Sequence, residues 1–278
     1  PYSFPEYLAA QGKDKNYLEV LSTKDRAEVV GMCDQYVKYG AFPELVDIRN
    51  KREYLNSIYQ TIYLGDIITR NKITNDFAVR LILKKIAESV TKPLSFNRLS
   101  NILKSAGAVL GKQTVINYVG YMMDSYMLFT LQNYAAKAGG KRDFAKILFY
   151  GYRLVRAYAY GLQFSAVGKP GRNRLIRRYG RENVFYFEKK TLKIDFYVPE
   201  EKLAIQVSLQ VLDQIDTRER EIGAFVKLKN FIGDATCLLI TNSEEEELDY
   251  EGVHVSVVPV WKWLLQNRKQ DIIKLCKK

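Results

Sequence analysis

The sequence predicts a multi-part α/β protein with three regions in chain order. Apolar residues at helical spacing occupy residues 1–90, which predicts an N-terminal helical linker or lid region. Over residues 91–152, helix, turn and helix precede two short apolar runs, the order of a winged helix-turn-helix. Over residues 153–278, strand-like runs flank a long helical segment, which predicts a layered C-terminal α/β domain.

The first region is predicted to be helical with one clear turn. The segment Asp25–Tyr39 places its apolar residues at helical intervals and ends at Gly40, a typical stop signal. The run Gly40–Pro43 predicts a turn. Two further helices are predicted over Lys51–Asn71 and Phe77–Val90.

The second region begins where Lys92-Pro93 breaks the helical pattern. Ser95 is a candidate cap for a helix that continues through Leu103, and Ala106-Gly107 predicts the next turn. The remaining predicted elements are a helix over Gln113–Met123, strands over Met127–Leu131 and Ile147–Tyr150, and a hairpin tip over Lys137–Arg142.

The third region is predicted to begin with helix over Leu154–Tyr179, interrupted at Gly168–Gly171. The predicted strands are Val184–Phe187, Ile194–Val198, Leu203–Val207, Cys237–Ile240 and Val253–Val257. A helix over Asp213–Lys229 separates the third and fourth strands, and a terminal helix closes the chain. The acidic run Glu244–Glu247 is predicted to be a solvated turn.

Composition narrows the classes of function. The formal net charge of +12 favours anionic partners, although a solvated basic surface accounts for charge alone equally well. The three cysteines are far apart and form no CxxC pair, which argues against a disulfide framework and fits a cytoplasmic protein. His254 is the only histidine, so clusters of metal-binding histidines are excluded. No apolar run is long enough to predict a membrane span.

The segment Gly107–Thr114 has the glycines and lysine of a phosphate-binding loop but the wrong spacing. A P-loop needs four residues between its glycines and a hydroxyl residue directly after the lysine, whereas here the spacing is one short and Gln113 intervenes. We therefore interpret the segment as the turn before the second helix.

That second helix is the candidate recognition helix. Its N-terminal end and the predicted wing tip carry the candidate nucleic-acid-binding residues: Lys112, Gln113, Thr114, Asn117, Lys137, Lys141 and Arg142. DNA is the partner that this arrangement favours. A winged helix that serves only as a protein–protein interaction module is the open alternative.

Two neighbouring predicted strands carry the positions of a PD-(D/E)XK nuclease motif. In such nucleases, two carboxylates hold Mg²⁺ and a lysine assists the attack on phosphate, with the second carboxylate and the lysine two residues apart on one strand face. Asp195 matches the first carboxylate, but Gln206 and Ser208 stand at the other two positions. We therefore predict a degenerate, non-cleaving nuclease-like domain, with residual Mg²⁺-dependent cleavage as an alternative.

Several segments together resemble AAA-type P-loop ATPases of archaea and bacteria that carry a C-terminal domain of unknown function. The matches are Ser3–Leu8 to "LSFxEFL", Gly40–Glu44 to "GGFPE", Asp66–Arg70 to "DIxxR", Lys193–Val198 to "EVDFVV", Ile205–Ser208 to "IEVK" or "IQVS", and Thr217–Glu221 to "ETREREF". Two departures from the family pattern argue against hydrolysis. Lys169–Gly171 lies near the place where the family has a "LEN" helix start, so an expected acidic residue is missing, and Ser208 replaces the lysine.

The resemblance implies a regulatory or nucleic-acid-binding region coupled to an ATPase domain upstream of Pro1. ATP and Mg²⁺ are then expected in that upstream domain, with no cofactor or metal in this chain and no catalytic residue of its own. The ATPase domain of the same parent chain is an expected partner, and a homo-oligomer stays open. The resemblance also makes Arg70 a candidate lid arginine, against the simpler prediction of an ion pair with Asp66 one turn earlier.

Overall fold

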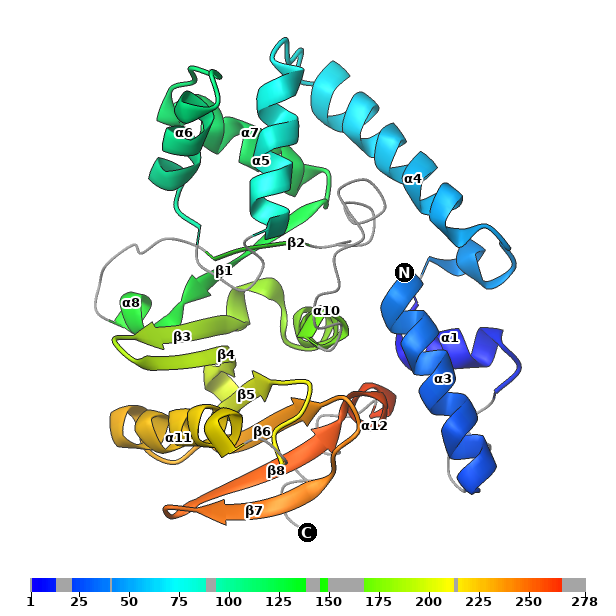
Figure 1. The fold of residues 1–278 in the computed structure, drawn as a ribbon, viewed down its shortest axis with the longest axis vertical. Helices are drawn as coiled ribbons and strands as arrows, with labels where there is room; N and C mark the ends of the chain where they lie inside the picture. The colour runs from blue at the N-terminus through cyan, green and yellow to red at the C-terminus, as the bar shows by residue number, and fades with distance from the viewer. Residues whose placement is uncertain are drawn as a thin grey trace. The chain divides into compact units, whose positions relative to one another are not determined.

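The computed structural model describes residues 2–13, 22–40, 42–88, 94–138, 146–149, 168–212 and 215–266. Contacts group the chain into two compact units: residues 48–163 form the middle unit, and residues 1–47 together with 164–278 form the outer unit. This grouping differs from the predicted ranges 1–90, 91–152 and 153–278, because the first helices group with the C-terminal region rather than with the helices that follow them. The fold as a whole is mixed α/β with a helical N-terminal part (Figure 1).

The outer unit is built on a mixed sheet with strand order β3-β4-β5-β6-β8-β7. Its strands are β3 (Phe185–Lys189), β4 (Leu192–Val198), β5 (Leu203–Val207), β6 (Thr236–Thr241), β7 (Glu246–Tyr250) and β8 (Val253–Pro259). The β5–β6 and β6–β8 pairs are parallel and the other pairs are antiparallel. Helix α11 (Ile215–Ile232) connects β5 to β6 and packs against β4 and β8 (Figure 1).

The remaining elements of the outer unit are α1 (Phe4–Ala10), α3 (Thr23–Tyr39), η1 (Pro43–Val46), α10 (Gly168–Tyr179), η3 (Arg181–Asn183), η4 (Pro199–Glu201) and α12 (Val260–Leu265). Helices α1 and α3 each begin with a capping box, in which a serine and the acidic residue three positions later bond each other's backbone. Both helices pack against α12, where the Arg26 guanidinium lies 5.2 Å from the centre of the Trp261 ring. These contacts explain why the N-terminal helices belong with the C-terminal sheet.

Two predictions in the outer unit were wrong. The acidic run from Glu244 does not stay a turn, because β7 begins at Glu246 and pairs with β8 while Leu248 turns inward, 7% exposed. Helix α10 runs through the predicted interruption at Gly168–Gly171. Pro170 lies in the first turn of that helix, where its missing N–H costs no hydrogen bond.

The middle unit consists of helices and a two-stranded antiparallel ribbon. Its elements are α4 (Lys51–Thr61), the π-helical segment η2 (Ile62–Thr69), α5 (Asp76–Glu88), α6 (Phe96–Ser105), α7 (Lys112–Asp124), β1 (Leu128–Asn133), α8 (Tyr134–Ala138) and β2 (Lys146–Phe149). Helix α6 packs against α5 and α7, α7 packs against β1, and β1 pairs with β2. The predicted order of helix, turn, helix and ribbon is confirmed at the level of these elements.

Local capping and turn chemistry explain the boundaries of α6 and α7. The Ser95 hydroxyl accepts a hydrogen bond from the Arg98 N–H at 3.2 Å, so the predicted cap of α6 is confirmed. Gly107 takes a positive φ of 83° in the turn that follows α6, a conformation that glycine adopts without steric cost. After β1, the chain enters the short helix α8, with the Asn133 side chain accepting a bond from the Ala135 N–H, and the rest of the predicted hairpin tip, residues 139–142, lies outside the described residues.

Candidate functional site

The three nuclease-motif positions lie where β4 and β5 stop pairing. The antiparallel β4–β5 ladder pairs Phe196 with Ile205, Tyr197 with Ala204 and Val198 with Leu203. Asp195 and Gln206 follow at the end of this ladder, Asp195 half-buried and Gln206 only 4% exposed. The structure therefore brings these two side chains together, as the sequence predicts.

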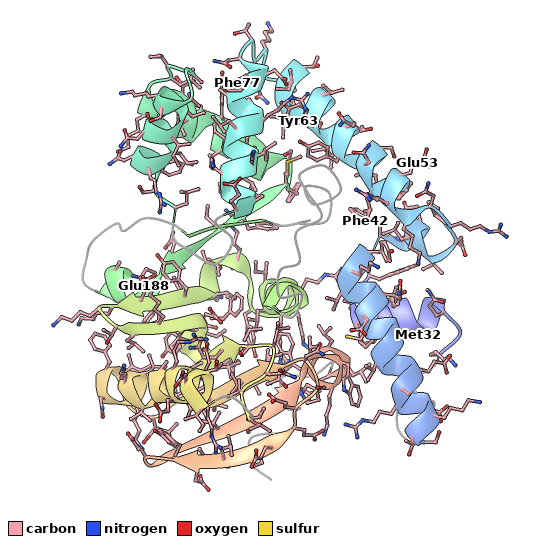
Figure 2. All side chains as sticks on the ribbon, in the orientation of Figure 1. Met32, Phe42, Glu53, Tyr63, Phe77 and Glu188 are labelled. Atoms are coloured by element: carbon pink, nitrogen blue, oxygen red, sulfur yellow. The ribbon has the colours of Figure 1, made fainter. Side chains whose placement is uncertain are left out.

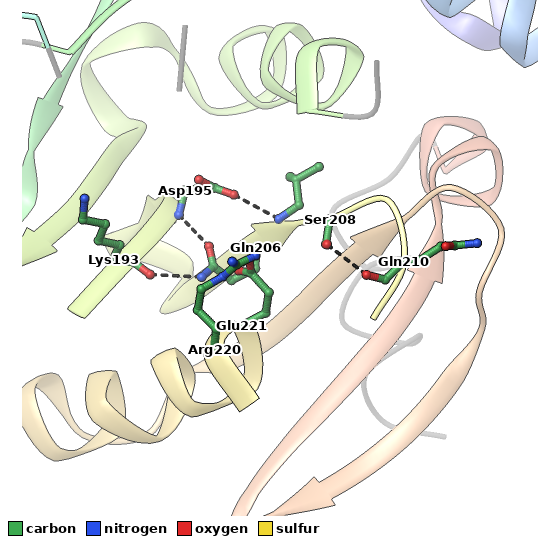
Figure 3. Close-up of polar contacts among 8 residues, drawn as sticks. Lys193, Asp195, Gln206, Ser208, Gln210, Arg220 and Glu221 are labelled. Carbon is green, nitrogen blue, oxygen red and sulfur yellow. Dashed lines mark hydrogen bonds and ion pairs between the residues drawn. The ribbon is translucent and has the colours of Figure 1, made fainter. Parts of the chain in front are cut away.

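Gln206 bridges the two strands through its side-chain amide (Figure 3). Its Oε1 accepts a hydrogen bond from the Asp195 N–H at 2.9 Å, and its Nε2 donates to the Lys193 carbonyl at 3.0 Å. In return, the Asp195 carboxylate accepts a bond from the Val207 N–H at 3.1 Å. Side chains thus replace the backbone ladder at this point of the sheet.

The two bonds of Gln206 require an amide. A carboxylate at position 206 accepts from the Asp195 N–H but has no hydrogen to donate to the Lys193 carbonyl. An amide nitrogen that is used as a donor is also no ligand for a divalent cation, which prefers carboxylate and carbonyl oxygens. Position 206 therefore has a structural role that conflicts with the metal-binding role of the nuclease motif.

Ser208 offers no cationic group at the third position. Its N–H donates to the Ile240 carbonyl at 3.0 Å, which continues the parallel pairing beyond β5. Its hydroxyl donates to the Gln210 carbonyl at 3.2 Å, as Figure 3 shows. The lysine that would assist phosphodiester cleavage thus has no counterpart at this position.

Glu221 on α11 is a second carboxylate close enough to feel the charge of Asp195, and no motif in the sequence singles it out. Its side chain is 13% exposed, and burial raises the pKa of this carboxyl, a shift opposed by a hydrogen bond from Arg220 and reinforced by the charge of Asp195. Glu221 lies on the inward face of α11, one turn before Phe225 and two turns before Leu228, both buried. In the sequence, Glu221 could have been found as a carboxylate that interrupts the apolar stripe of this helix.

The acidic groups do not complete a nuclease metal site. Asp195 and Glu221 are two carboxylates, but the motif position between them holds the hydrogen-bonded amide of Gln206. Over the described part of the chain, no three His, Cys, Asp or Glu side chains gather as a metal-binding group. The donor set around Asp195 therefore does not fit the Mg²⁺ that a PD-(D/E)XK nuclease uses.

The second candidate site is the exposed face of α7 in the middle unit. Lys112, Gln113 and Asn117 are exposed and Thr114 is half-buried. The Gln113 Nε2 donates a hydrogen bond to the Asn117 Oδ1 at 3.0 Å, so these two amides are held side by side one turn apart. The opposite face of α7 is buried against the unit's core through Val115, Tyr118, Val119 and Met122.

The predicted wing residues fall partly outside the described chain. Lys137 belongs to the short helix α8, in the connection between β1 and β2, and its side chain is not among those described. Lys141 and Arg142 lie outside the described residues. The β1–β2 ribbon itself is present and antiparallel.

The two units differ sharply in charge. The middle unit, residues 48–163, contains 18 lysines and arginines against six aspartates and glutamates. The outer unit contains 25 of each. The whole formal excess of +12 therefore belongs to the unit that carries α6, α7 and the ribbon.

Tyr63 in the π-helical segment η2 is fully buried and bonds to a pair of half-buried residues of α5 in the same unit (Figure 2). Its hydroxyl donates to the Asp76 carboxylate, which also accepts from Arg80 Nε at 2.7 Å. Burial raises the pKa of Asp76, but these hydrogen bonds outweigh it and hold that pKa below its usual value.

Arg70, at the end of η2, is exposed, and its predicted ion pair with Asp66 is not among those of the described residues. An exposed pair of this kind gains little stability in water.

Comparisons with known proteins give similarity without a function. Residues 31–158 match a domain of unknown function, DUF8612. The chain is 28% identical to the uncharacterized protein MJ1544 of Methanocaldococcus jannaschii over 95% of this chain and 62% of that protein. It is 24% identical to an uncharacterized protein of Haemophilus influenzae over 96% of this chain and 64% of that protein. The chain thus spans less than two thirds of either relative, and no solved structure matches it significantly.

Among the described residues, no helix is both long and apolar enough to cross a membrane.

Proposed function

We propose that this chain is the nucleic-acid-binding region of a larger protein and that its nuclease-like sheet does not cleave. The observation that carries the proposal is the location of the net charge. The entire excess of +12 lies in residues 48–163, where a winged helix-turn-helix reading of α6, α7 and the ribbon places Lys112, Gln113 and Asn117 on an exposed helix face. Phosphate backbones attract such a basic unit, whatever their sequence.

The arrangement around Gln206 supports the non-cleaving part of the proposal. A metal-dependent nuclease needs an anionic oxygen where this chain has an amide that bonds two strands together. It also needs a cation where this chain has Ser208. In this reading, a PD-(D/E)XK-like scaffold has kept its sheet and exchanged its catalytic groups for structural ones.

The coupling to an ATPase rests on the sequence resemblance. The relatives are longer than this chain, which leaves room in them for a further domain. ATP and Mg²⁺ belong to that domain in this proposal, and Arg70, exposed at the end of η2, is the candidate to approach the nucleotide. Cytoplasmic placement belongs to the same proposal.

A salt-titrated binding assay on this chain tests the nucleic-acid proposal. We expect affinity for DNA that falls steeply with salt, and a several-fold weaker complex for Lys112→Gln and for Lys141→Gln/Arg142→Gln. Lys227→Gln is the matched control, because Lys227 is an exposed lysine on a helix of the neutral outer unit. If the middle-unit variants weaken DNA binding no more than Lys227→Gln does, binding is not a property of the middle unit and the assignment is rejected.

A protein-interaction module is the second candidate, favoured by exposed apolar side chains in the same unit. Phe77 is 56% exposed, Val109 80% and Tyr126 71%. Single exposed apolar residues are normal on protein surfaces. This observation therefore supports a protein-interaction module less strongly than the charge distribution supports nucleic-acid binding. A stable protein complex that is lost in Val109→Ser or Tyr126→Ser, together with no measurable DNA binding, would favour this candidate.

A further inference from the structure

Helix α6 presents a polar stripe along its whole length. The exposed residues are Asn97, Arg98, Asn101, Lys104 and Ser105, which recur at the spacing of one helix face. The opposite face is buried through Leu99, Ser100 and Leu103. The core of the unit therefore fixes the direction in which Arg98 and Lys104 point, about one and two-thirds turns apart on the surface.

This stripe belongs to a segment without any acidic residue. From residue 89 to residue 123 the sequence contains no Asp or Glu, and its four cations are Lys92, Arg98, Lys104 and Lys112. The segment includes all of α6, the turn, and α7 up to its last residue, Asp124. Helices of soluble proteins normally mix both signs of charge on their exposed faces. A face of one sign matches a polyanion.

The amide pair on α7 adds a different kind of contact. Gln113 and Asn117 are exposed and bonded to each other. Amide side chains carry both a donor and an acceptor, and in this they match the edge of an adenine in the major groove. Two elements thus offer two chemistries: cations on α6 and amides on α7.

Neither helix offers a surface on which unpaired bases would stack. The aromatic residues of α6 and α7 are Phe96, Tyr118 and Tyr121, of which Tyr118 is buried and the other two are half-buried. Proteins that bind single strands without sequence preference use exposed aromatic platforms. The exposed aromatic side chains in the described part of the unit, Phe77 and Tyr126, lie outside these two helices, so the exposed faces of α6 and α7 favour a paired ligand.

We infer that the nucleic acid bound by the middle unit is duplex DNA, with Arg98 and Lys104 of α6 on the phosphate backbone and Gln113 and Asn117 of α7 at base edges in the major groove. This inference rests on the proposed function. B-form DNA has a major groove that admits an α-helix, whereas the major groove of A-form RNA is too deep and narrow for side chains to reach the bases.

The test compares the salt dependence of binding for three versions of this chain. Fluorescence anisotropy is measured with a random-sequence 20-bp DNA duplex, the matching single strand and the matching RNA duplex, between about 50 and 200 mM salt. We expect the DNA duplex to bind at least tenfold more tightly than the single strand. We expect the slope of log affinity against log salt to fall by about 2 in Arg98→Gln/Lys104→Gln, since each phosphate contact contributes about 0.9. Lys227→Gln should keep the slope of the unmodified chain.

The amide pair gives the second arm of the experiment. Duplexes that the unmodified chain enriches from a random-sequence pool serve as its probes, and Gln113→Ala/Asn117→Ala should weaken binding to them while the salt slope is retained, because no charge is removed. Circular dichroism melting verifies that each variant is folded, which their exposed positions predict. Equal or tighter binding of the single strand or of the RNA duplex, or an unchanged slope in the α6 variant, would overturn the inference and leave the proposed function standing. Absence of binding to all three probes would overturn both.

Discussion

The two units use their polar residues in opposite ways. In the outer unit, acidic and basic residues balance, and the polar side chains of the motif region, Asp195 and Gln206, bond the backbone of their own sheet. In the middle unit, cations outnumber acids three to one, and the exposed residues Arg98, Lys104 and Lys112 are free to face a partner. The nuclease-like motif thus lies in the unit without net charge, and the charge lies in the unit without that motif.

This difference shows why a motif and a binding surface need separate arguments. A sheet that carries one residue of a nuclease motif does not imply cleavage when its polar groups are used for strand pairing. A basic unit does not imply catalysis either, because phosphate attraction requires only charge. Substitutions that separate strand pairing from binding therefore test the comparison directly.

The largest effect is expected at Gln206. Gln206→Ala should lower the free energy of unfolding by about 3 kcal/mol, because it leaves the Asp195 N–H and the Lys193 carbonyl without the bonds that now hold β4 to β5. Urea unfolding followed by circular dichroism measures the change. Gln210→Ala, at an exposed glutamine of the following loop, is the control and should lie within about 0.5 kcal/mol of the unmodified chain.

Gln206→Glu restores the carboxylate of the nuclease motif and so tests whether position 206 needs an amide. It should also destabilise the chain, since the new carboxylate cannot donate to the Lys193 carbonyl and lies near the charge of Asp195. We expect no cleavage of DNA by this variant with Mg²⁺ or Mn²⁺, because Ser208 still lacks a charge. Metal-dependent cleavage by the unmodified chain would contradict the structural role of Gln206 outright.

An intermediate effect is expected at Tyr63 in the middle unit. Tyr63→Phe removes the hydroxyl that donates to Asp76 and should cost about 1–2 kcal/mol of unfolding free energy. DNA affinity should stay unchanged, because the side chain is fully buried. A large loss of affinity in a folded Tyr63→Phe protein would show that binding does not depend on the exposed charge alone.

The smallest effect is expected at His254 on β8. Hydrogen bonding to Asp249, together with the charges of Asp249 and Glu247, raises the pKa of the imidazole in the folded chain. The protonated form therefore stabilises the fold below the unfolded pKa of about 6.5, and this contribution disappears as the pH rises through the folded pKa. The stability difference between the unmodified chain and His254→Gln, measured by urea unfolding at pH 5.5 and 8.5, should shrink at the higher pH. The ring is 44% exposed, so the change should stay below about 1 kcal/mol. A difference that grows with pH would contradict the assigned shift.

Patterns of apolar spacing predicted most helices and strands, because burial of one face decides them. They did not predict β7, since Glu246 and Glu247 give the segment the composition of a loop while only Leu248 points inward. They also did not predict the grouping of α1 and α3 with α12, because contacts between residues near opposite ends of the chain leave no local pattern.

The candidate sites show the same limit. Sequence alone located positions 195, 206 and 208 and the exposed residues of α7, because these follow from motif spacing and helix periodicity. It did not show that Gln206 bonds the backbone of β4, since that depends on where two strands diverge. It also missed Glu221, whose importance comes from its proximity to Asp195 across the layer between helix and sheet.

The order of the strands has one further consequence. Strand β7 ends the sheet of the outer unit, so one side of its backbone has no neighbouring strand in the described chain. Glu246, Glu247 and Asp249 are exposed along this border. Glu247 and Asp249 also pair with His254 of β8. Charged side chains along a border strand discourage the sheets of two molecules from joining edge to edge. The acidic residues that give β7 the composition of a loop thus also make it a poor edge for pairing with another copy.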